Sequence, residues 1–533
     1  MPAASANRKL AQTVLEQALA WGAREFVVCA GSRNSPLVLP LLEARGKGIL
    51  RVWHHYDERA AAFFALGLAK RDGRPVAVVT TSGTAAAELL PATIEAHYSG
   101  IPLVLLTADR PKRFRATGAP QAIEQAGLFG PYVEACLDAE EAVDFPVGFP
   151  WNRRGPIHLN PGFEEPEPDF GPFDLTIPPG PNRVGSGTQQ GWVGDPTLLS
   201  RFVADFTGGT VLLGALEARD RDEVKKFVKI LNCPVWAEAT SGLRESKILQ
   251  NCLIRDSEAF FGRKRPHKIL RIGGVPSLRF WRDLETRFDI EVLSISRQSF
   301  TGLGRVSERI DWLDFSEVFV KNSENHLLSE LSEIARIDSL LQSFPESEAA
   351  WYRRLSEAIP SEAPLFLGNS LAIRQWNLAA SFKNSHPNCH ASRGANGIDG
   401  QISTFLGVAA GAGESWGIFG DLTALHDLGA PWVLDQLGRD ARRRFVVVNN
   451  GGGKIFSRLP SLAGAAPEFR DVIENRHGLN FAHWAGLWNL RHVRLSGADS
   501  LRDFGDEDVA IEIVPNSEQT EGFWAARQQM LSS

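Results

Sequence analysis

The sequence has little cysteine, no long apolar run and no excess of positive charge, and each shortage excludes a class of protein. Its five cysteines, at positions 29, 136, 233, 252 and 389, form no C-x-x-C pair. An odd number without such spacing argues against a disulfide framework and a zinc site, and suits a reducing compartment. No apolar run approaches the roughly 18 residues that a membrane-spanning helix needs.

The net charge and the N-terminal residues exclude two further classes, nucleic-acid-binding proteins and proteins with a signal peptide. The net charge is −6 and the pI about 6.1, whereas a nucleic-acid-binding domain normally carries a basic patch and a high pI. The first residues lack the apolar core of a signal peptide; Leu10, Val14, Ala18 and Leu19 instead predict one face of an amphipathic helix. We therefore expect a cytoplasmic protein with no nucleic-acid partner and no membrane span.

Strand and helix patterns alternate along three successive segments, residues 1–180, 188–340 and 345–533. Short apolar runs such as PVAVVTTSG, KILRIGG and RFVVVNN end in small or polar residues, and helical stretches lie between them. This alternation predicts an α/β protein of three doubly wound, parallel-sheet domains. The stretch 164–187, rich in Pro, Gly and acidic residues, predicts a linker. In such sheets ligands bind beyond the carboxyl ends of the strands.

One such strand end is FVVVNNGGGKIF, residues 445–456. It is neither a dinucleotide fingerprint nor a phosphate loop, because Val448 stands where the first glycine of the latter is required. Asp421, after the strand WGIF, precedes Asn450 by about thirty residues. A carboxylate, an amide oxygen and a glycine carbonyl are ligands that suit magnesium. Either residue alone reads as a helix cap or an ordinary turn, but the pair at matched strand ends favours a metal site.

This spacing of GD and NN resembles the thiamine-diphosphate-dependent enzymes. The resemblance implies that Asp421, Asn450 and the carbonyl of Gly452 hold Mg²⁺, or Mn²⁺ in its place. It implies that Gly420, Leu422 and Thr423 bind the diphosphate, where helix-opening amides favour phosphate. Glu58, in HHYDERAAAFFALGLAKRDG, matches the glutamate that these enzymes direct at the aminopyrimidine ring to promote proton transfer. Without the C-terminal motif, Glu58 reads as a favourable residue in a helix first turn.

The motifs AGSRNSPLVLPLL, VAVVTTSGTAAAELLPATIEA, PLVLLTADRP, GNSLAIR, SRGANGIDGQISTFLGVA and VVVNNGGGKIFSRLP resemble, in order, a narrower family. These are the 2-succinyl-5-enolpyruvyl-6-hydroxy-3-cyclohexene-1-carboxylate synthases of menaquinone biosynthesis. The resemblance implies decarboxylation of 2-oxoglutarate on thiamine diphosphate and addition of the succinyl carbanion to isochorismate. It also implies pyrimidine-binding, central and diphosphate-binding domains, and a homodimer or homotetramer with active sites between chains.

Arginines at predicted strand ends and loops fit two dianionic substrates, because guanidinium groups bind carboxylates bidentately and keep their charge. Each alone reads as a surface ion pair. The resemblance gives catalytic roles to Glu58, Gln121, Arg33 and Arg393. Ile455 and Phe456, with Leu459, would form an apolar wall near the thiazolium, with plain core packing as the alternative. The expected substrate-binding residues are Ser32, Arg33, Arg110, Arg279, Ser370, Arg374, Arg393, Ile398 and Leu459.

The sequence departs from the family pattern at three places. Leu278 precedes Arg279 where a lysine is common, so one positive charge is absent. GDLT has Thr423 where serine is common, and NNGGG replaces NNNGG. Two alternatives stay open: another thiamine enzyme, such as an acetohydroxyacid synthase or 2-oxoacid decarboxylase, and a cofactor-free regulatory relative. Elsewhere, the run Arg442-Arg443-Arg444 predicts a solvated helix end.

Overall fold

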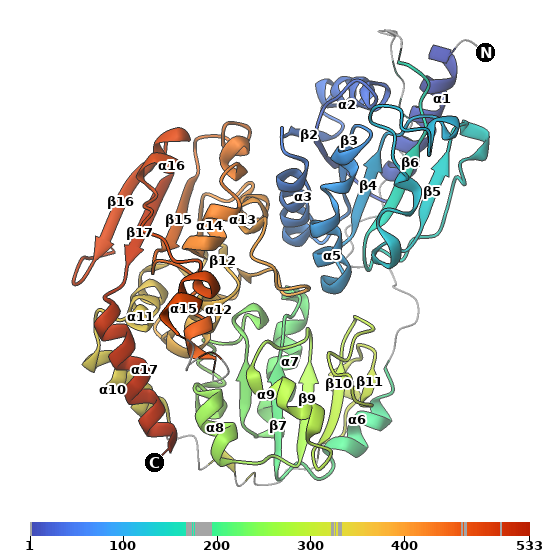
Figure 1. The fold of residues 1–533 in the computed structure, drawn as a ribbon. Coiled ribbons are helices and arrows are strands. Elements are labelled where there is room, and N and C mark those ends of the chain that lie inside the picture. Colours follow the sequence, from blue (N-terminus) through green and yellow to red (C-terminus); the bar gives the residue numbers. More distant parts are fainter. Residues whose placement is uncertain are drawn as a thin grey trace. The chain divides into compact units, whose positions relative to one another are not determined.

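The protein contains three separate parallel sheets, each built from one of the three alternating segments (Figure 1). The computed structural model describes residues 3–166, 173, 175, 194–320, 325, 327–328, 333–459, 462, 466–501 and 504–532. Most of the predicted linker, 164–187, lies outside them. The predicted α/β class with parallel sheets is confirmed, and none of the helices in these ranges is long and apolar enough to cross a membrane.

The described chain divides into two compact units. The first combines Met1–Thr188 with Gly394–Gly411 and His426–Arg439, and the second combines Gln189–Arg393, Ala412–Leu425 and Asp440–Ser533. The N-terminal sheet belongs to the first unit. The central and C-terminal sheets both belong to the second.

The N-terminal sheet has six strands in the order β2-β1-β3-β4-β6-β5. Its middle strands, VAVVT and LVLLT, are buried at every residue, as expected where helices cover both faces. The predicted face of the first helix is buried throughout. The elements are α1 (Ala3–Ala20), β1 (Glu25–Val28), α2 (Ser35–Gly46), β2 (Arg51–His54), α3 (Glu58–Asp72), β3 (Val76–Thr80), α4 (Thr84–Ala87), α5 (Leu90–Ser99), β4 (Leu103–Thr107), β5 (Cys136–Ala139) and β6 (Ile157–Pro161).

The central sheet has five strands in the order β11-β10-β9-β7-β8. Its β7 strand, GTVLL, is buried at every residue, and α7 lays Val224, Phe227, Val228 and Leu231 against the core. The elements are α6 (Pro196–Val203), β7 (Gly209–Leu213), α7 (Arg221–Leu231), β8 (Val235–Ala237), α8 (Ser257–Arg263), β9 (Lys268–Ile272), α9 (Arg279–Asp283), β10 (Glu291–Ile295) and β11 (Glu308–Ile310).

The C-terminal sheet, β13-β12-β14-β15-β17-β16, repeats the strand order of the N-terminal one when each is numbered from its own first strand. The two segments therefore share a topology as well as a sequence pattern. The elements are α10 (Glu333–Ser343), α11 (Glu348–Ala358), β12 (Leu365–Leu367), α12 (Leu371–Ala379), β13 (Cys389–His390), α13 (Gln401–Ala409), β14 (Glu414–Gly420), α14 (Asp421–His426), β15 (Arg442–Val448), α15 (Pro467–Glu474), α16 (Ala482–Leu487), β16 (Arg491–Ser496), β17 (Val509–Val514) and α17 (Ser517–Ser532).

Within the first unit, α3 and α13 pack backbone against backbone at two glycines. A Cβ added to Gly67 would lie 2.1 Å from the carbonyl oxygen of Thr404, and one added to Gly407 would lie 2.3 Å from that of Phe64. The two helices therefore cross closer than any side chain allows.

The prediction for the arginine run is wrong. Arg442, Arg443 and Arg444 begin β15, and the last two are buried. The Arg443 guanidinium pairs with Asp508 at 2.8 Å, and Arg444 donates to the carbonyl oxygen of Glu507 at 2.6 Å. Buried guanidinium groups are tolerated when paired and hydrogen-bonded, and here the partners come from residues more than sixty positions away.

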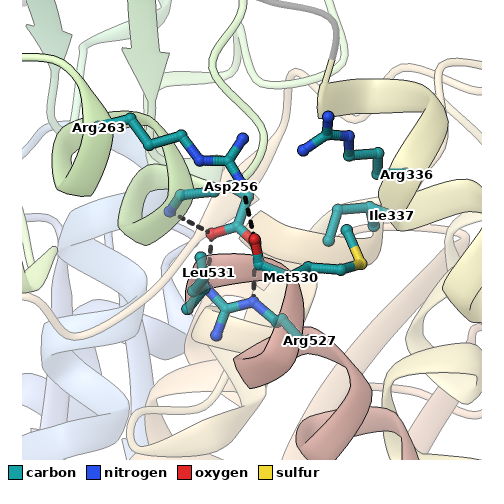
Figure 2. Close-up of a pocket in the computed structure, with 8 residues that line it drawn as sticks. Asp256, Arg263, Arg336, Ile337, Arg527, Met530 and Leu531 are labelled. Carbon is teal, nitrogen blue, oxygen red and sulfur yellow. Dashed lines mark hydrogen bonds and ion pairs between the residues drawn. The ribbon is translucent and has the colours of Figure 1, made fainter. Parts of the chain in front are cut away.

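The C-terminal helix α17 is fastened to the central domain by ion pairs around a small pocket (Figure 2). Arg527 donates to both carboxylate oxygens of Asp256, at 2.8 and 2.5 Å, and to Glu258 at 2.9 Å. Arg263 donates to the carbonyl oxygen of Met530 at 2.6 Å. The charged side chains at this pocket therefore hold α17 against α8.

Candidate active site

The carboxyl ends of β14 and β15 lie side by side, because Gly420 pairs with Val448 in parallel register. The residues that follow the two strands therefore meet at one edge of the sheet. Asp421 accepts N–H bonds from Gly451 at 2.8 Å and Gly452 at 2.9 Å through one oxygen, and from Leu422 at 2.6 Å through the other. The structure thus joins GD to the glycine turn, as the spacing predicted.

Asn450 lies in this turn with its two amide ends in different surroundings. Its Nδ2 donates to Glu348 Oε2 at 3.1 Å. Its Oδ1 is buried and accepts no hydrogen bond from any residue that the structure describes. A buried carbonyl-type oxygen without a donor is costly unless something else satisfies it, and a hard cation does so.

The electrostatics of the turn also fit a cation. Burial raises the pKa of Asp421, against the effect of its backbone N–H partners. Burial also raises the pKa of Glu348, which Asn450 and Arg458 lower and Asp421 raises further. His477 Nε2 lies 3.4 Å from Asp421 Oδ2. Two buried carboxyl groups beside an unsatisfied amide oxygen form an acidic, oxygen-rich site that suits Mg²⁺.

Glycine is required at position 452 because the backbone of Glu474 lies close to it. Gly452 has φ +132°, and a Cβ there would lie 2.6 Å from the carbonyl oxygen of Glu474. The Gly453 N–H donates to that same oxygen at 2.5 Å, and Lys454 pairs with the Glu474 side chain at 2.7 Å. The carbonyl oxygen of Gly452 accepts the Lys454 N–H at 2.8 Å and keeps a second lone pair.

The other predicted cofactor-binding residues of the second unit are Gly420, Leu422 and Thr423, which precede the turn in the chain, and Ile455, Phe456 and Leu459, which follow it. Thr423 is buried in α14 and Leu422 is half-buried. Gly420 has open space around it, since a Cβ added there would meet only Thr423 Oγ1, at 3.9 Å. Ile455 and Leu459 are half-buried and Phe456 is 37 % exposed. None of the three apolar residues is part of the buried core, so core packing does not explain them.

Glu58 is the first residue of α3 and follows β2. The preceding Asp57 caps the helix by accepting the Ala60 N–H at 3.0 Å, so Glu58 is not needed as the cap. Burial raises the pKa of Glu58, and the nearby charges of Asp57 and Glu88 raise it further. A carboxyl group with a raised pKa at a strand end is typical of proton-transfer sites.

The other predicted substrate-binding residues of the first unit differ in how exposed their side chains are. Ser32 is exposed. Arg33 is buried, and it donates to the Phe163 carbonyl oxygen at 3.1 Å and to Glu165 at 2.7 Å. Arg110 is half-buried, with its guanidinium carbon 5.3 Å from the ring centre of Phe114.

Gln121 has an exposed side chain on a strained backbone. Its φ is +56°, which is uncommon for a residue other than glycine. Its Cα lies 3.2 Å from where a Cβ of Gly83 would stand, so glycine is needed opposite it. Strain of this kind is concentrated at functional sites.

Arg374 and Arg393 lie near the buried Glu238 in the second unit, and Ser370 contacts Arg374. Arg393 donates to Asn369 at 2.7 Å, and its other terminal nitrogen lies 3.4 Å from Glu238. Arg374 donates to the carbonyl oxygen of Ser370, which has φ +63°. Burial and the charge of Arg393 lower the pKa of Arg374 to about 10, although part of its side chain reaches solvent.

The structure does not bring Arg279 into this group. Its side chain is 56 % exposed and lies 4.0 Å from Asp283 of its own helix. Arg282, one turn later on α9, is instead close enough to lower the pKa of Arg374. Ile398 is half-buried and lies in the first unit.

Comparison with known proteins decides the family. Residues 8–128 match the N-terminal, TPP-binding domain of thiamine pyrophosphate enzymes. A 2-succinyl-5-enolpyruvyl-6-hydroxy-3-cyclohexene-1-carboxylate synthase of Bdellovibrio bacteriovorus is 38 % identical over 97 % of this chain and 98 % of its own. The chain belongs to this synthase family. A synthase of the same name from Akkermansia muciniphila is 38 % identical, with 96 % of each chain covered, and one from Myxococcus xanthus is 34 % identical, covering 94 % and 92 %.

Membership of the synthase family makes the protein a thiamine-diphosphate-dependent enzyme, with Mg²⁺ as the fitting metal. A solved structure of a thiamin diphosphate-dependent protein from Mycobacterium smegmatis superimposes with a TM-score of 0.65, covering 95 % of this chain and 99 % of that one. At 16 % identity it supports the fold alone. The buried Asp421 carboxylate and the unsatisfied Asn450 Oδ1 fit the metal that the synthase family implies.

Sequence reasoning missed several residues that complete the site. Glu348 reads as an ordinary acid in a helix first turn, and Glu238 and Asn369 carry no local motif. Each is recognisable only after folding brings it to Asn450 or to the arginines. The missed residues are Glu238, Arg282, Glu348, Asn369, Glu474 and His477.

Proposed function

We propose that this protein decarboxylates 2-oxoglutarate with thiamine diphosphate and Mg²⁺ and joins the succinyl carbanion to isochorismate. The products are CO₂ and 2-succinyl-5-enolpyruvyl-6-hydroxy-3-cyclohexene-1-carboxylate, in menaquinone biosynthesis. The observation that carries the proposal is the glycine turn. It bonds to Asp421 through the Gly451 N–H and holds the buried Oδ1 of Asn450 without a donor among the described residues, in a chain collinear with synthases of that name. When bound, thiamine diphosphate supplies the electron sink for decarboxylation.

The second unit holds the metal and diphosphate end of the cofactor in this proposal. Asp421, Asn450 and the carbonyl of Gly452 bind Mg²⁺, which also takes phosphate oxygens and water as ligands. Gly420, Leu422 and Thr423 contact the diphosphate. Ile455, Phe456 and Leu459 shield the reacting carbon from water.

Glu58 exchanges a proton with the aminopyrimidine ring nitrogen. Its raised pKa keeps more of the protonated form near neutral pH, which is the form that donates to that nitrogen. Gln121, held in a strained backbone, presents its exposed amide to the reaction centre.

The arginines bind the two dianionic substrates. Arg374 and Arg393 carry two positive charges beside the one negative charge of Glu238, which leaves a net positive site. Ser370 assists from the same strand end. Ser32, Arg33, Arg110 and Ile398 contribute from the first unit, and Arg33 must release the exposed Glu165 to do so. Arg279 stays in the set as a solvent-exposed contact, with Arg282 beside Arg374.

We further propose domain boundaries at 1–180, 188–340 and 345–533, and a homodimer or homotetramer with its sites between chains. Glu58 and Asp421 belong to different compact units of the chain. The five free thiols support a cytoplasmic location.

The test follows isochorismate by absorbance in a complete mixture and in mixtures lacking 2-oxoglutarate, Mg²⁺ or thiamine diphosphate. Isochorismate should disappear only in the complete mixture. Release of CO₂ from 2-oxoglutarate with isochorismate unchanged would show a different acceptor. Binding of the cofactor without turnover of either substrate would contradict the proposed reaction.

A further inference from the structure

The amide of Asn450 must be oriented before it can bind a metal. An asparagine side chain has an oxygen that can ligate a cation and an NH₂ group that cannot. Nothing in the glycine turn itself decides which end faces the cation site. The orientation is set by Glu348, which accepts a hydrogen bond from Asn450 Nδ2 at 3.1 Å.

Glu348 is itself rigidly held. It is buried, and it opens α11 directly after Ser347, whose side chain accepts the Ala350 N–H at 3.2 Å. Its backbone N–H donates to Thr520 Oγ1 of α17 at 3.0 Å. The backbone of Glu348 is therefore fixed by the start of one helix and by its contact with another.

We propose that Glu348 is a positioning residue that orients the Asn450 amide and thereby makes its Oδ1 a metal ligand. With Nδ2 bonded to Glu348, Oδ1 is the end left buried and without a donor among the described residues. A flipped amide would set its oxygen against the Glu348 carboxylate and turn two N–H donors toward the cation. This inference rests on the metal-binding part of the proposed function, and on no step of the reaction.

The test is Mn²⁺ affinity, measured from the EPR signal of free Mn²⁺ with thiamine diphosphate present and no substrate. Glu348→Met keeps most of the volume but removes the acceptor, and its affinity should fall about 10- to 100-fold, as for other residues that orient metal ligands. Glu348→Gln retains a carbonyl acceptor for Nδ2, and its affinity should stay within about threefold of wild type.

Glu245→Ala is the matched control. Glu245 is equally buried and accepts the Trp376 indole N–H at 2.8 Å, in the central domain. Its loss should lower the melting temperature without changing Mn²⁺ affinity, which separates general destabilisation from orientation.

Unchanged affinity in Glu348→Met would overturn the proposal, and so would an equal loss in Glu348→Gln, since charge and not orientation would then matter. If Glu348→Met does not fold, the double variant Glu348→Gln with Asn450→Asp reverses the polarity of the same contact. It should bind Mn²⁺ within about threefold of wild type, and a tenfold loss would refute the orienting role. A wild-type protein that binds no Mn²⁺ with thiamine diphosphate would instead contradict the proposed function.

Discussion

Replacing Gly452 by alanine tests whether the glycine turn is built to hold the metal ligands. At φ +132° an alanine is strained by about 1–3 kcal/mol, and its Cβ would stand 2.6 Å from the Glu474 carbonyl oxygen. Backbone oxygen cannot move aside as a flexible side chain can. The turn must therefore open, and the two N–H bonds to Asp421 must weaken with it.

The size of the effect follows from the strain. If only the native turn binds the metal, a penalty of about 1–3 kcal/mol lowers the competent fraction, and hence Mn²⁺ affinity, about 5- to 150-fold. The assay is Mn²⁺ titration with thiamine diphosphate.

Gly478→Ala is the control, because a Cβ there meets nothing within 4 Å and the backbone needs no positive φ. Its affinity should not change. Wild-type affinity in Gly452→Ala, in a folded protein, would refute the reasoning.

Three further predictions concern the assembled site. A mixture of inactive Glu58→Gln and inactive Asp421→Ala chains should regain some activity, because each mixed dimer contains one intact site; no recovery despite subunit exchange would contradict sites shared between chains. The pKa of Glu58 is raised on folding, so its stabilising effect is complete at acid pH and is lost as pH rises through the folded pKa. Glu58→Gln should therefore gain stability relative to wild type from pH 4 to pH 8 in denaturant titrations, and a constant difference would argue against the shift. Arg393→Lys should raise the KM for a dianionic substrate by about 10- to 150-fold, because a charged hydrogen bond contributes about 1.5–3 kcal/mol. The exposed Arg279→Lys should change KM less than about threefold, and equal effects would contradict the assigned geometry.

Local sequence patterns were sufficient to find the two strands that lead to the predicted metal site, and the residues at their ends. The runs WGIF and RFVVV are buried parallel strands, and their adjacency in the sheet brings Asp421 to the glycine turn. The strand character follows from periodicity, and the shared edge of their ends follows from the rule for parallel sheets, whereas their adjacency is a finding of the structure.

What could not be predicted depends on contacts between distant residues. Glu348 lies 102 positions from Asn450, and no spacing rule connects them. The prediction for the arginine run was wrong for the same reason. Asp508, which makes the burial of Arg443 tolerable, lies 65 positions away. No local pattern distinguishes Arg279, which lies near Asp283, from Arg282, which is close enough to affect the pKa of Arg374.

The crossing of α3 and α13 has a consequence for how far this protein can be altered. Because Gly67 meets the Thr404 carbonyl oxygen with no side chain between them, there is no neighbouring group that a second substitution could trim to make room. A larger residue would displace the helix that begins at Glu58, so a position far from the chemistry along that helix should act like an active-site position in a mutational scan. An engineer seeking stability would do better to leave this glycine alone and to substitute those with open space around them.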